Sequence, residues 1–461
     1  MRNFFRLFIQ ALKGENIDAT TGKMDKVIFL LAVPMIFEMF MESLFAVVDI
    51  FFVSRVGVEA VAAVGLTEST LTVVYALGFG LSMGATALVS RRVGEHNVTG
   101  AAEAAMQAIY LGLGLAFFIS LAGVFFPSDL LQLMGASESM VAAGSGYTRW
   151  MLTGNFAIIL LFLHNGIFRG AGDAGLAMKS LILSNIINMV LDPFFIFGIW
   201  IFPEMGVTGA AVATTIGRTC GVLFQMYHLT RGTALVHLNR RVFALRMDVV
   251  KRIVILSSGS AGQFIIASAS WIFLMRIMSN FGDAVLAGYT TAIRILIFSI
   301  LPAWGISNAA ATIVGQNLGA KQPERAEQGV WRTSFFNMVF MAAVTCIFVG
   351  FPETFMRLFT ENEVVVREGV TCLRIVCLGY IAYGYEMVLA NAINGAGDTR
   401  TPTIINVFGF WLLQIPLAWF FAIQLGIGSQ GIYAAVPISE TAMAVIYVLI
   451  FKKGKWKTVQ M

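Results

Sequence analysis

The sequence predicts an all-α membrane protein in which twelve transmembrane helices form two parallel six-helix lobes. Composition, the spacing of apolar runs and an internal repeat lead to this fold class. Hydrophobic residues make up 58% of the 461 residues, charged residues only 12%, and the mean hydropathy is +0.80. Soluble proteins carry about 25% charged residues, so most of this surface must face lipid. The composition excludes disordered, fibrous and nucleic-acid-binding proteins.

Twelve apolar runs reach the length of about 20 residues that a helix needs to cross a bilayer. They cover residues 27–53, 60–90, 104–126, 141–168, 177–201, 207–230, 251–279, 285–315, 330–351, 367–393, 402–425 and 429–451. Several runs exceed the thickness of the bilayer, which indicates tilted or kinked helices. Pro34, Pro302, Pro416 and Pro437 lie inside runs, where neighbouring helices make a proline tolerable by satisfying the freed carbonyl group.

The net charge of +5 follows membrane topology. If both termini are cytoplasmic, the outside loops and nearby span ends hold only Arg55, Arg149, Arg276, Arg357 and Arg367. Because Lys and Arg remain on the cytoplasmic side, we expect both termini there. We expect residues 1–26 to be a cytoplasmic segment that carries an amphipathic helix at the leaflet surface and no cleaved signal. Residues 452–461 are a basic cytoplasmic tail.

The chain consists of two copies of one unit. Matching segments recur at an offset of 225 residues (282 − 57 = 225): Gly57 with Gly282, Gly94 with Gly319, and 170–173 with 395–398. Each unit holds six spans, an even number, so the two halves insert in the same orientation and are related by an axis along the membrane normal. This predicts an N-lobe at 27–230, a cytoplasmic linker at 231–250 and a C-lobe at 251–451.

Polar residues inside the spans are distributed unequally between the two copies. Ionisable groups within a bilayer are costly and usually functional. Five polar positions of the first half meet apolar counterparts in the second: Asp49 with Leu274, Asn165 with Ala390, Asn188 with Leu413, Asp192 with Leu417 and, at an offset of 222, Thr214 with Val436. Asn188 and Asp192 are i and i+4, so they share one helix face. Two carboxylates with neutral oxygens suit Na⁺ or a shared proton; the alternative is a structural hydrogen-bond network.

A substrate cleft is also predicted. Met35, Met39 and Phe40 of the first span provide adaptable apolar surface for varied ligands. Tyr383, Glu386 and Arg294 of the second half are further candidates for the cleft. We expect no cofactor: no GxxxxGK[ST] motif occurs, and the GxGxxG at 170–175 follows an apolar helix, which indicates a turn.

At these residues the chain resembles the multidrug and toxic compound extrusion (MATE) family. The resemblance covers nearly the whole chain and rests on Pro34 with Val48-Asp49, Phe168-Arg-Gly-Ala-Gly-Asp173, Asn188-x-x-x-Asp192-Pro193 and Gly206-x-x-Gly209. It implies a cation site in the N-lobe formed by Asp49, Asn188 and Asp192, completed by Asn165 and Thr214. One branch of the family also uses a glutamate of span seven and an aspartate of span ten. Here the region 259–273 has no acid and Tyr383 stands at the span-ten position, with Glu386 one turn away.

These observations predict a secondary antiporter, not an enzyme, that exports amphipathic or cationic compounds in exchange for H⁺ or Na⁺. We expect a monomer in the cytoplasmic membrane of a prokaryote. Two alternatives stay open. A lipid-linked oligosaccharide flippase of the same superfamily would need a cationic cavity, whereas the charges within the spans are mostly acidic. An intramembrane enzyme would use Asp49 and Asp192 as a catalytic dyad, although no second catalytic signature accompanies them.

Overall fold

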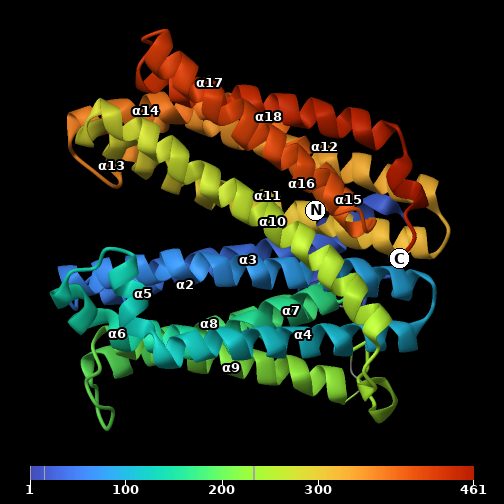
Figure 1. Ribbon diagram of the computed structural model, residues 1–461. Coiled ribbons are helices and arrows are strands. Elements are labelled where there is room, and N and C mark those ends of the chain that lie inside the picture. The colour runs from blue at the N-terminus through green and yellow to red at the C-terminus, as the bar shows by residue number, and fades with distance from the viewer. Residues whose placement is uncertain (1, 15, 232–233) are drawn as a thin grey trace.

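The protein is all-α and its helices form two bundles (Figure 1). The computed structural model describes residues 2–14, 16–231 and 234–461, and no strand occurs among them. Residues 1 and 15 of the predicted N-terminal segment, and 232–233 of the predicted linker, lie outside the described residues. A short amphipathic helix, α1 (Arg2–Lys13), precedes the first bundle and packs against its first long helix, with Phe8 against Phe37.

The first bundle contains six of the predicted spans. They are α2 (Met24–Val53), α3 (Val58–Gly94), α4 (Val98–Phe125), α6 (Glu138–Thr153) joined to α7 (Asn155–Ala171), α8 (Ala174–Phe197) and α9 (Val207–Thr230). The α6–α7 pair bends by 42°. A short helix, α5 (Pro127–Leu133), follows α4.

The second bundle repeats this order. It contains α10 (Met247–Met278), α11 (Asp283–Gly319), the pair α12 (Pro323–Gly350) and α13 (Pro352–Arg357), then α14 (Glu363–Val376) joined to α15 (Tyr380–Gly395), and α18 (Ser429–Lys452). Its fifth span runs from α16 (Arg400–Asn406) through α17 (Ile415–Trp419) with π-helical turns before and after α17. Pro416 lies in α17 between these turns, where widened turns accommodate the missing N–H. Among the described residues, ten helices or helical runs are long and apolar enough to cross a membrane. The bent α6–α7 pair makes an eleventh, and α14–α15 lies at the twelfth predicted position.

The internal repeat is visible in the backbone. Left-handed residues recur at the same offset, with His96 (φ 55°) equivalent to Lys321 (φ 58°) and Gly172 (φ 85°) equivalent to Gly397 (φ 96°). Each pair closes the turn after the equivalent helix, so both copies use the same helix ends. A glycine at the turn is free to adopt this conformation, because it has no Cβ to clash.

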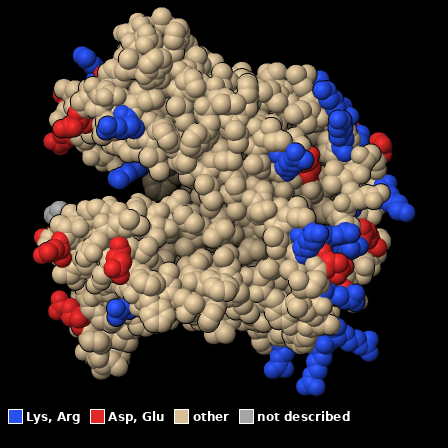
Figure 2. All heavy atoms as spheres, viewed as in Figure 1, with Lys and Arg blue, Asp and Glu red and all other residues tan. Residues whose placement is uncertain are grey.

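The two bundles are tied together by their first helices. The helix α10 packs mainly against α3 of the first bundle, and α2 packs against α11 of the second as well as α8. The bundles meet at the end where both termini lie and diverge toward the end that carries α5, α6 and α13 (Figure 1). Figure 2 shows the resulting opening between the lobes, and Lys and Arg crowd the opposite, closed end.

Candidate ion-coupling and substrate sites

The predicted polar pair on α8 forms the centre of a buried cluster in the N-lobe. Asn188 Nδ2 donates to Asp192 Oδ1 (3.1 Å) and to Thr214 Oγ1 of α9 (3.2 Å). Asp49 of α2 is also buried and lies close enough to Asp192 for their charges to interact. The structure therefore brings together four of the five predicted cation-site residues.

The cluster leaves oxygen atoms free for a ligand. Asp49 Oδ1, Asn188 Oδ1 and Asp192 Oδ2 are buried, and none has a hydrogen-bond partner among the described residues. Buried acceptors without a partner are costly, and a proton or a small cation would satisfy them. No group of three or more His, Cys, Asp or Glu side chains suited to a metal ion occurs in the described part of the chain. The donor set therefore suits a proton, or Na⁺ with two carboxylates and neutral oxygens.

Asn165 takes a different place from the one predicted. Its Nδ2 donates to Glu38 Oε1 (2.9 Å), and its Oδ1 accepts from Gln225 Nε2 (2.6 Å) and Ser180 Oγ (3.3 Å). None of its hydrogen bonds within the described ranges reaches Asp49 or the α8 pair. The reason is the rotation of α7, which points Asn165 toward a second polar cluster around Glu38.

This second cluster contains a buried ion pair. Arg169 Nη1 donates to Glu38 Oε1 (3.0 Å) and Nη2 donates to Ser82 Oγ (2.8 Å). The equivalent positions of the C-lobe, 225 residues later, are Gln263 and Asn394. These two amides exchange two hydrogen bonds of 3.0 Å. The same two positions of the repeat therefore hold a charged pair in the N-lobe and a pair of neutral amides in the C-lobe.

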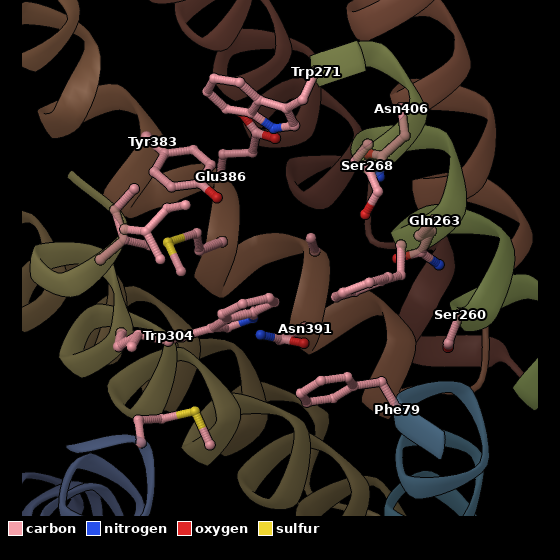
Figure 3. Close-up of a pocket in the computed structure, with 18 of the residues that line it drawn as sticks. Phe79, Ser260, Gln263, Ser268, Trp271, Trp304, Tyr383, Glu386, Asn391 and Asn406 are labelled. Carbon is pink, nitrogen blue, oxygen red and sulfur yellow. The ribbon is translucent and has the colours of Figure 1, made fainter. Parts of the chain in front are cut away.

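A cavity of about 650 Å³ lies between the lobes. Figure 3 shows Tyr383, Glu386 and Trp271 on one side of the cavity and Gln263 and Ser268 on another. Of the predicted cleft residues, Met39, Tyr383, Glu386 and Arg294 line the cavity.

Two predicted cleft residues do not line this cavity. Met35 is completely buried in the contact between α2 and α11, and Phe40 is 54% exposed at another face of α2. Met35 shares a helix face with Met39 but lies one turn further along α2, where α11 covers it, whereas Phe40 points to another face of the helix. His164 is buried in the N-lobe, where its Nδ1 lies 3.1 Å from Gln225 Oε1.

Stacked aromatic rings form the apolar part of the cavity. Phe79 and Trp304 stack at 5.9 Å with an interplanar angle of 10°, and Phe264 stacks on Phe79 at 5.5 Å. Phe79 and Trp304 are equivalent in the repeat (79 + 225 = 304). The stacked pair therefore joins corresponding positions of the two lobes, and a planar ligand could extend it.

Few charged residues line the cavity, and they include both signs, whereas the charges within the spans as a whole are mostly acidic. Arg169, Arg294 and Glu386 line it. Arg169 is paired with Glu38, and Glu386 lies within hydrogen-bonding range of Glu440 on α18. Arg294 has no ion-pair or hydrogen-bond partner in the described parts of the chain. The acidic excess expected from the spans thus lies mainly inside the N-lobe.

The amides Gln263, Asn391 and Asn394 at the cavity were not among the predicted site residues. Asn391, three residues before Asn394 in the sequence, donates from Nδ2 to Ser307 Oγ (2.9 Å) in the C-lobe. Burying a neutral amide costs less free energy than burying a charge, so an amide within a span stands out less in the sequence. The repeat could have identified Gln263 and Asn394, because they occupy the positions equivalent to Glu38 and Arg169.

A two-lobed helical bundle with a cavity between the lobes and a polar cluster in one of them defines a membrane transporter. The chain matches the MatE family over residues 34–194 and 260–420, and it belongs to the MATE family of transporters. The two matched segments correspond to the two copies of the repeat.

Individual relatives agree with this assignment along nearly the whole chain. A probable multidrug resistance protein NorM of Thermotoga maritima is 27% identical over 98% of this chain and 97% of its own. An FAD transporter of Shewanella oneidensis is 25% identical over 87% of this chain and 88% of its own. These relatives are transporters, so the intramembrane-enzyme alternative is not supported.

Solved structures show the same arrangement. An outward-facing multidrug resistance MATE family transporter of the MOP superfamily has a TM-score of 0.90 at 27% identity and covers 96% of this chain and 99% of its own. A MOP superfamily transporter from Pyrococcus furiosus, described as having a binding pocket of reversed polarity, has a TM-score of 0.90 at 26% identity and covers 96% and 99%.

Proposed function

We propose that this protein is a secondary antiporter that exports amphipathic, often cationic, small molecules in exchange for inward H⁺ or Na⁺. The observation that carries the proposal is a buried Asp49–Asn188–Asp192–Thr214 cluster in one lobe of a protein whose two lobes together line a cavity. A cation that neutralises the two carboxylates changes the packing of that lobe, and a change in one lobe alters the cavity between them.

The orientation follows from the charges. We place both termini and the crowded Lys and Arg side chains in the cytoplasm, because basic segments remain on that side. The opening between the lobes then faces outward. Inward movement of one positive charge provides about 2.3 kcal/mol per 100 mV of membrane potential, which would drive export against a gradient.

The test is transport by the purified protein in liposomes of defined internal pH and Na⁺. A fluorescent organic cation is the probe, and the pH gradient and the Na⁺ gradient are imposed separately. We expect one of the two gradients to drive accumulation on the side opposite to ion entry. Accumulation that is the same with and without both gradients would contradict antiport.

A second candidate function is export of an anionic aromatic compound. Arg294 favours it, since this arginine lines the cavity without a partner among the described residues, close to stacked rings. A relative named as an FAD transporter makes a flavin nucleotide a reasonable probe. Running the same liposome assay with flavin and with the organic cation, in the parent and in Arg294→Gln, separates the two. Loss of flavin transport alone in the variant would favour the anionic substrate. The same partnerless arginine keeps the lipid-linked oligosaccharide flippase open as an alternative, for which scrambling of a lipid-linked pyrophosphate is the assay.

A further inference from the structure

Arg218 is a buried arginine that is held by few specific contacts. It lies on α9 and is 4% exposed. Its nearest acid is Glu42 of α2, at 3.6 Å between Nη2 and Oε2, which is longer than a hydrogen bond. Arg218 Nη1 and Glu42 Oε1 are both buried without a hydrogen-bond partner within the described ranges.

Aromatic rings surround the guanidinium. Its carbon lies 5.0 Å from the ring centroid of Phe45, 6.0 Å from Tyr75 and 5.9 Å from Phe162. Contacts between a cation and the face of a ring stabilise the charge but impose little direction. The guanidinium is therefore accommodated at its place without being locked there.

The contrast with Arg169 shows that this is not general for buried arginines in this lobe. Arg169 is similarly buried, at 6% exposure, but makes hydrogen bonds of 3.0 Å to Glu38 and 2.8 Å to Ser82. The two arginines thus form a natural comparison, one fixed by short hydrogen bonds and the other surrounded by rings.

Arg218 is placed next to the proposed cation site. On α9 it follows Thr214 by four residues, so both lie on one face a turn apart. On α2, Glu42 and Asp49 are seven residues apart, on one face and about 10 Å along the axis. The charge of Arg218 interacts with Glu42, Glu68 and Asp49. The guanidinium therefore has a choice of carboxylates within one cluster.

The charges that face Arg218 are mostly negative. Glu42 and Asp49 come from α2, Glu68 and the phenol of Tyr75 from α3, while Asp192 of α8 interacts with Asp49. Tyr147 of α6 donates to Glu68 Oε1 (3.3 Å). Four carboxyl groups therefore gather around one arginine, and the cluster has capacity for a second positive charge.

The repeat indicates that the fold does not require this arrangement. The positions equivalent to Glu42, Asp49, Glu68 and Arg218 are Ala267, Leu274, Ile293 and Glu440. The C-lobe forms the same set of helices without a buried arginine there. Burying a charge is costly. Because only the N-lobe contains this buried arginine, we infer that the arginine serves a function of the N-lobe and not the fold.

We propose that Arg218 is a tethered counter-cation of the ion site: it pairs with Glu42 when the coupling ion is bound, and turns to Asp49 when the ion leaves. It is a positioning residue that acts through Asp49, and this role rests on the proposed antiport function. Its movement would keep the buried carboxylates from being left without a positive partner in the ion-free protein. The structure holds the guanidinium on the Glu42 side.

The role predicts opposite effects for two substitutions. Arg218→Gln removes the competing cation, so the coupling ion should bind more tightly, with at least a tenfold lower ion concentration at half-maximal export and a slower maximal rate. Glu42→Gln removes the alternative partner, so Arg218 should remain at Asp49 and the half-maximal ion concentration should rise at least threefold. Arg218→Lys keeps a charge and should shift the value less than Arg218→Gln.

The experiment is ion-driven export of the organic cation in liposomes, with the ion concentration varied and each variant purified as a monodisperse protein. Arg246→Gln is the control: its ion pair with Glu103 of α4 (3.1 Å) is exposed and away from both sites, so this variant should change the half-maximal ion concentration by less than twofold. Equal half-maximal concentrations in the parent, Arg218→Gln and Glu42→Gln would overturn the proposal, even if rates fall. If Arg218→Gln does not fold, Glu42→Gln alone decides. If the parent shows no ion-driven export, the proposed function fails first.

Discussion

Two equivalent glycines, Gly80 and Gly305, allow close contacts between the lobes. A Cβ at Gly80 of α3 would lie 2.5 Å from the carbonyl oxygen of Ser257 and 2.8 Å from the Cβ of Ala261, both on α10. A Cβ at Gly305 of α11 would lie 2.7 Å from Ile36 N on α2. Gly305 is Gly80 plus 225, and Ala261 is Ile36 plus 225. The same contact is therefore made twice, once by each lobe on the other.

Gly80→Ala should shift the protein toward conformations in which the lobes separate at the end that carries the termini. Backbone neighbours at 2.5–2.8 Å cannot accept a methyl group without moving apart. Overpacking of this kind costs about 1–3 kcal/mol, and about 1.4 kcal/mol changes a two-state ratio tenfold. Gly305→Ala should act in the same direction, and the two effects should roughly add because the sites share no contact residue.

Double electron–electron resonance measures this shift. Spin labels at Glu95 and Glu324, both exposed and one in each lobe, report the separation at this end, in a background without Cys220 and Cys346, which are not buried. We expect Gly80→Ala to add a longer component to the distance distribution. Gly65→Ala is the control, since it lies on the same helix with no atom within 4 Å of the new Cβ. An unchanged distribution for Gly80→Ala, or the same change for Gly65→Ala, would refute the reasoning.

Four further predictions follow from the same structure. Asp49→Asn and Asp192→Asn should keep the fold and abolish ion-driven export in the liposome assay. Substitutions at the equivalent positions of the C-lobe, Leu274→Ala and Leu417→Ala, should leave coupling intact. Export at the parental rate by both asparagine variants would exclude the N-lobe site. Cysteines at 55 and 357 should react with an impermeant thiol reagent from outside and cysteines at 91, 241 and 321 from inside, and labelling of 241 from outside would reverse the orientation. Glu38→Gln should lower the melting temperature strongly, because removing one partner of a buried ion pair costs about 3–5 kcal/mol. Adding Arg169→Asn copies the neutral Gln263–Asn394 pair of the C-lobe and should recover most of the loss. No recovery would mean that the amide pair is not equivalent to the ion pair. Burial raises the pKa of Asp173, in the turn after α7, from 3.8 to about 6, so its ionisation opposes folding increasingly from about pH 4 and fully above about pH 6. Asp173→Asn should therefore raise the melting temperature at pH 7.5, and the gain should fade between pH 6 and 4. A gain independent of pH would exclude this cause.

The features that depend on one helix or on chain order could be predicted from the sequence. Span positions follow from apolar length, and the pairing of Asn188 with Asp192 follows from their spacing of four residues, which holds in any α-helix. The turn at 170–175 follows from glycine, and Gly172 is indeed left-handed. Local periodicity and the repeat contain all of this information.

Features that depend on how helices rotate against one another could not be predicted. Asn165 has two possible sets of polar partners in the N-lobe, and only the packed position of α7 selects Glu38, Ser180 and Gln225. Met39 reaches the cavity while Met35, one turn away, is buried against α11, because α2 packs on two bundles at once. The rotation of α7 decides the first case and the position along α2 decides the second, and hydropathy resolves neither.

The two lobes show what the buried charges contribute. They share helix ends, turn conformations and the glycine contact between lobes, so the backbone is specified without the N-lobe charges. At one equivalent pair of positions the N-lobe has Glu38 and Arg169, and the C-lobe has two amides with the same bond length of 3.0 Å. Burying a charge costs more than burying an amide, so the N-lobe is the less economical version of a common design. Its added cost is confined to the lobe that also holds Asp49 and Asp192. We infer that the duplication allowed the two copies to carry different buried titratable groups on one backbone: Asp49 and Asp192 in the N-lobe, and the neighbouring carboxyls of Glu386 and Glu440 in the C-lobe.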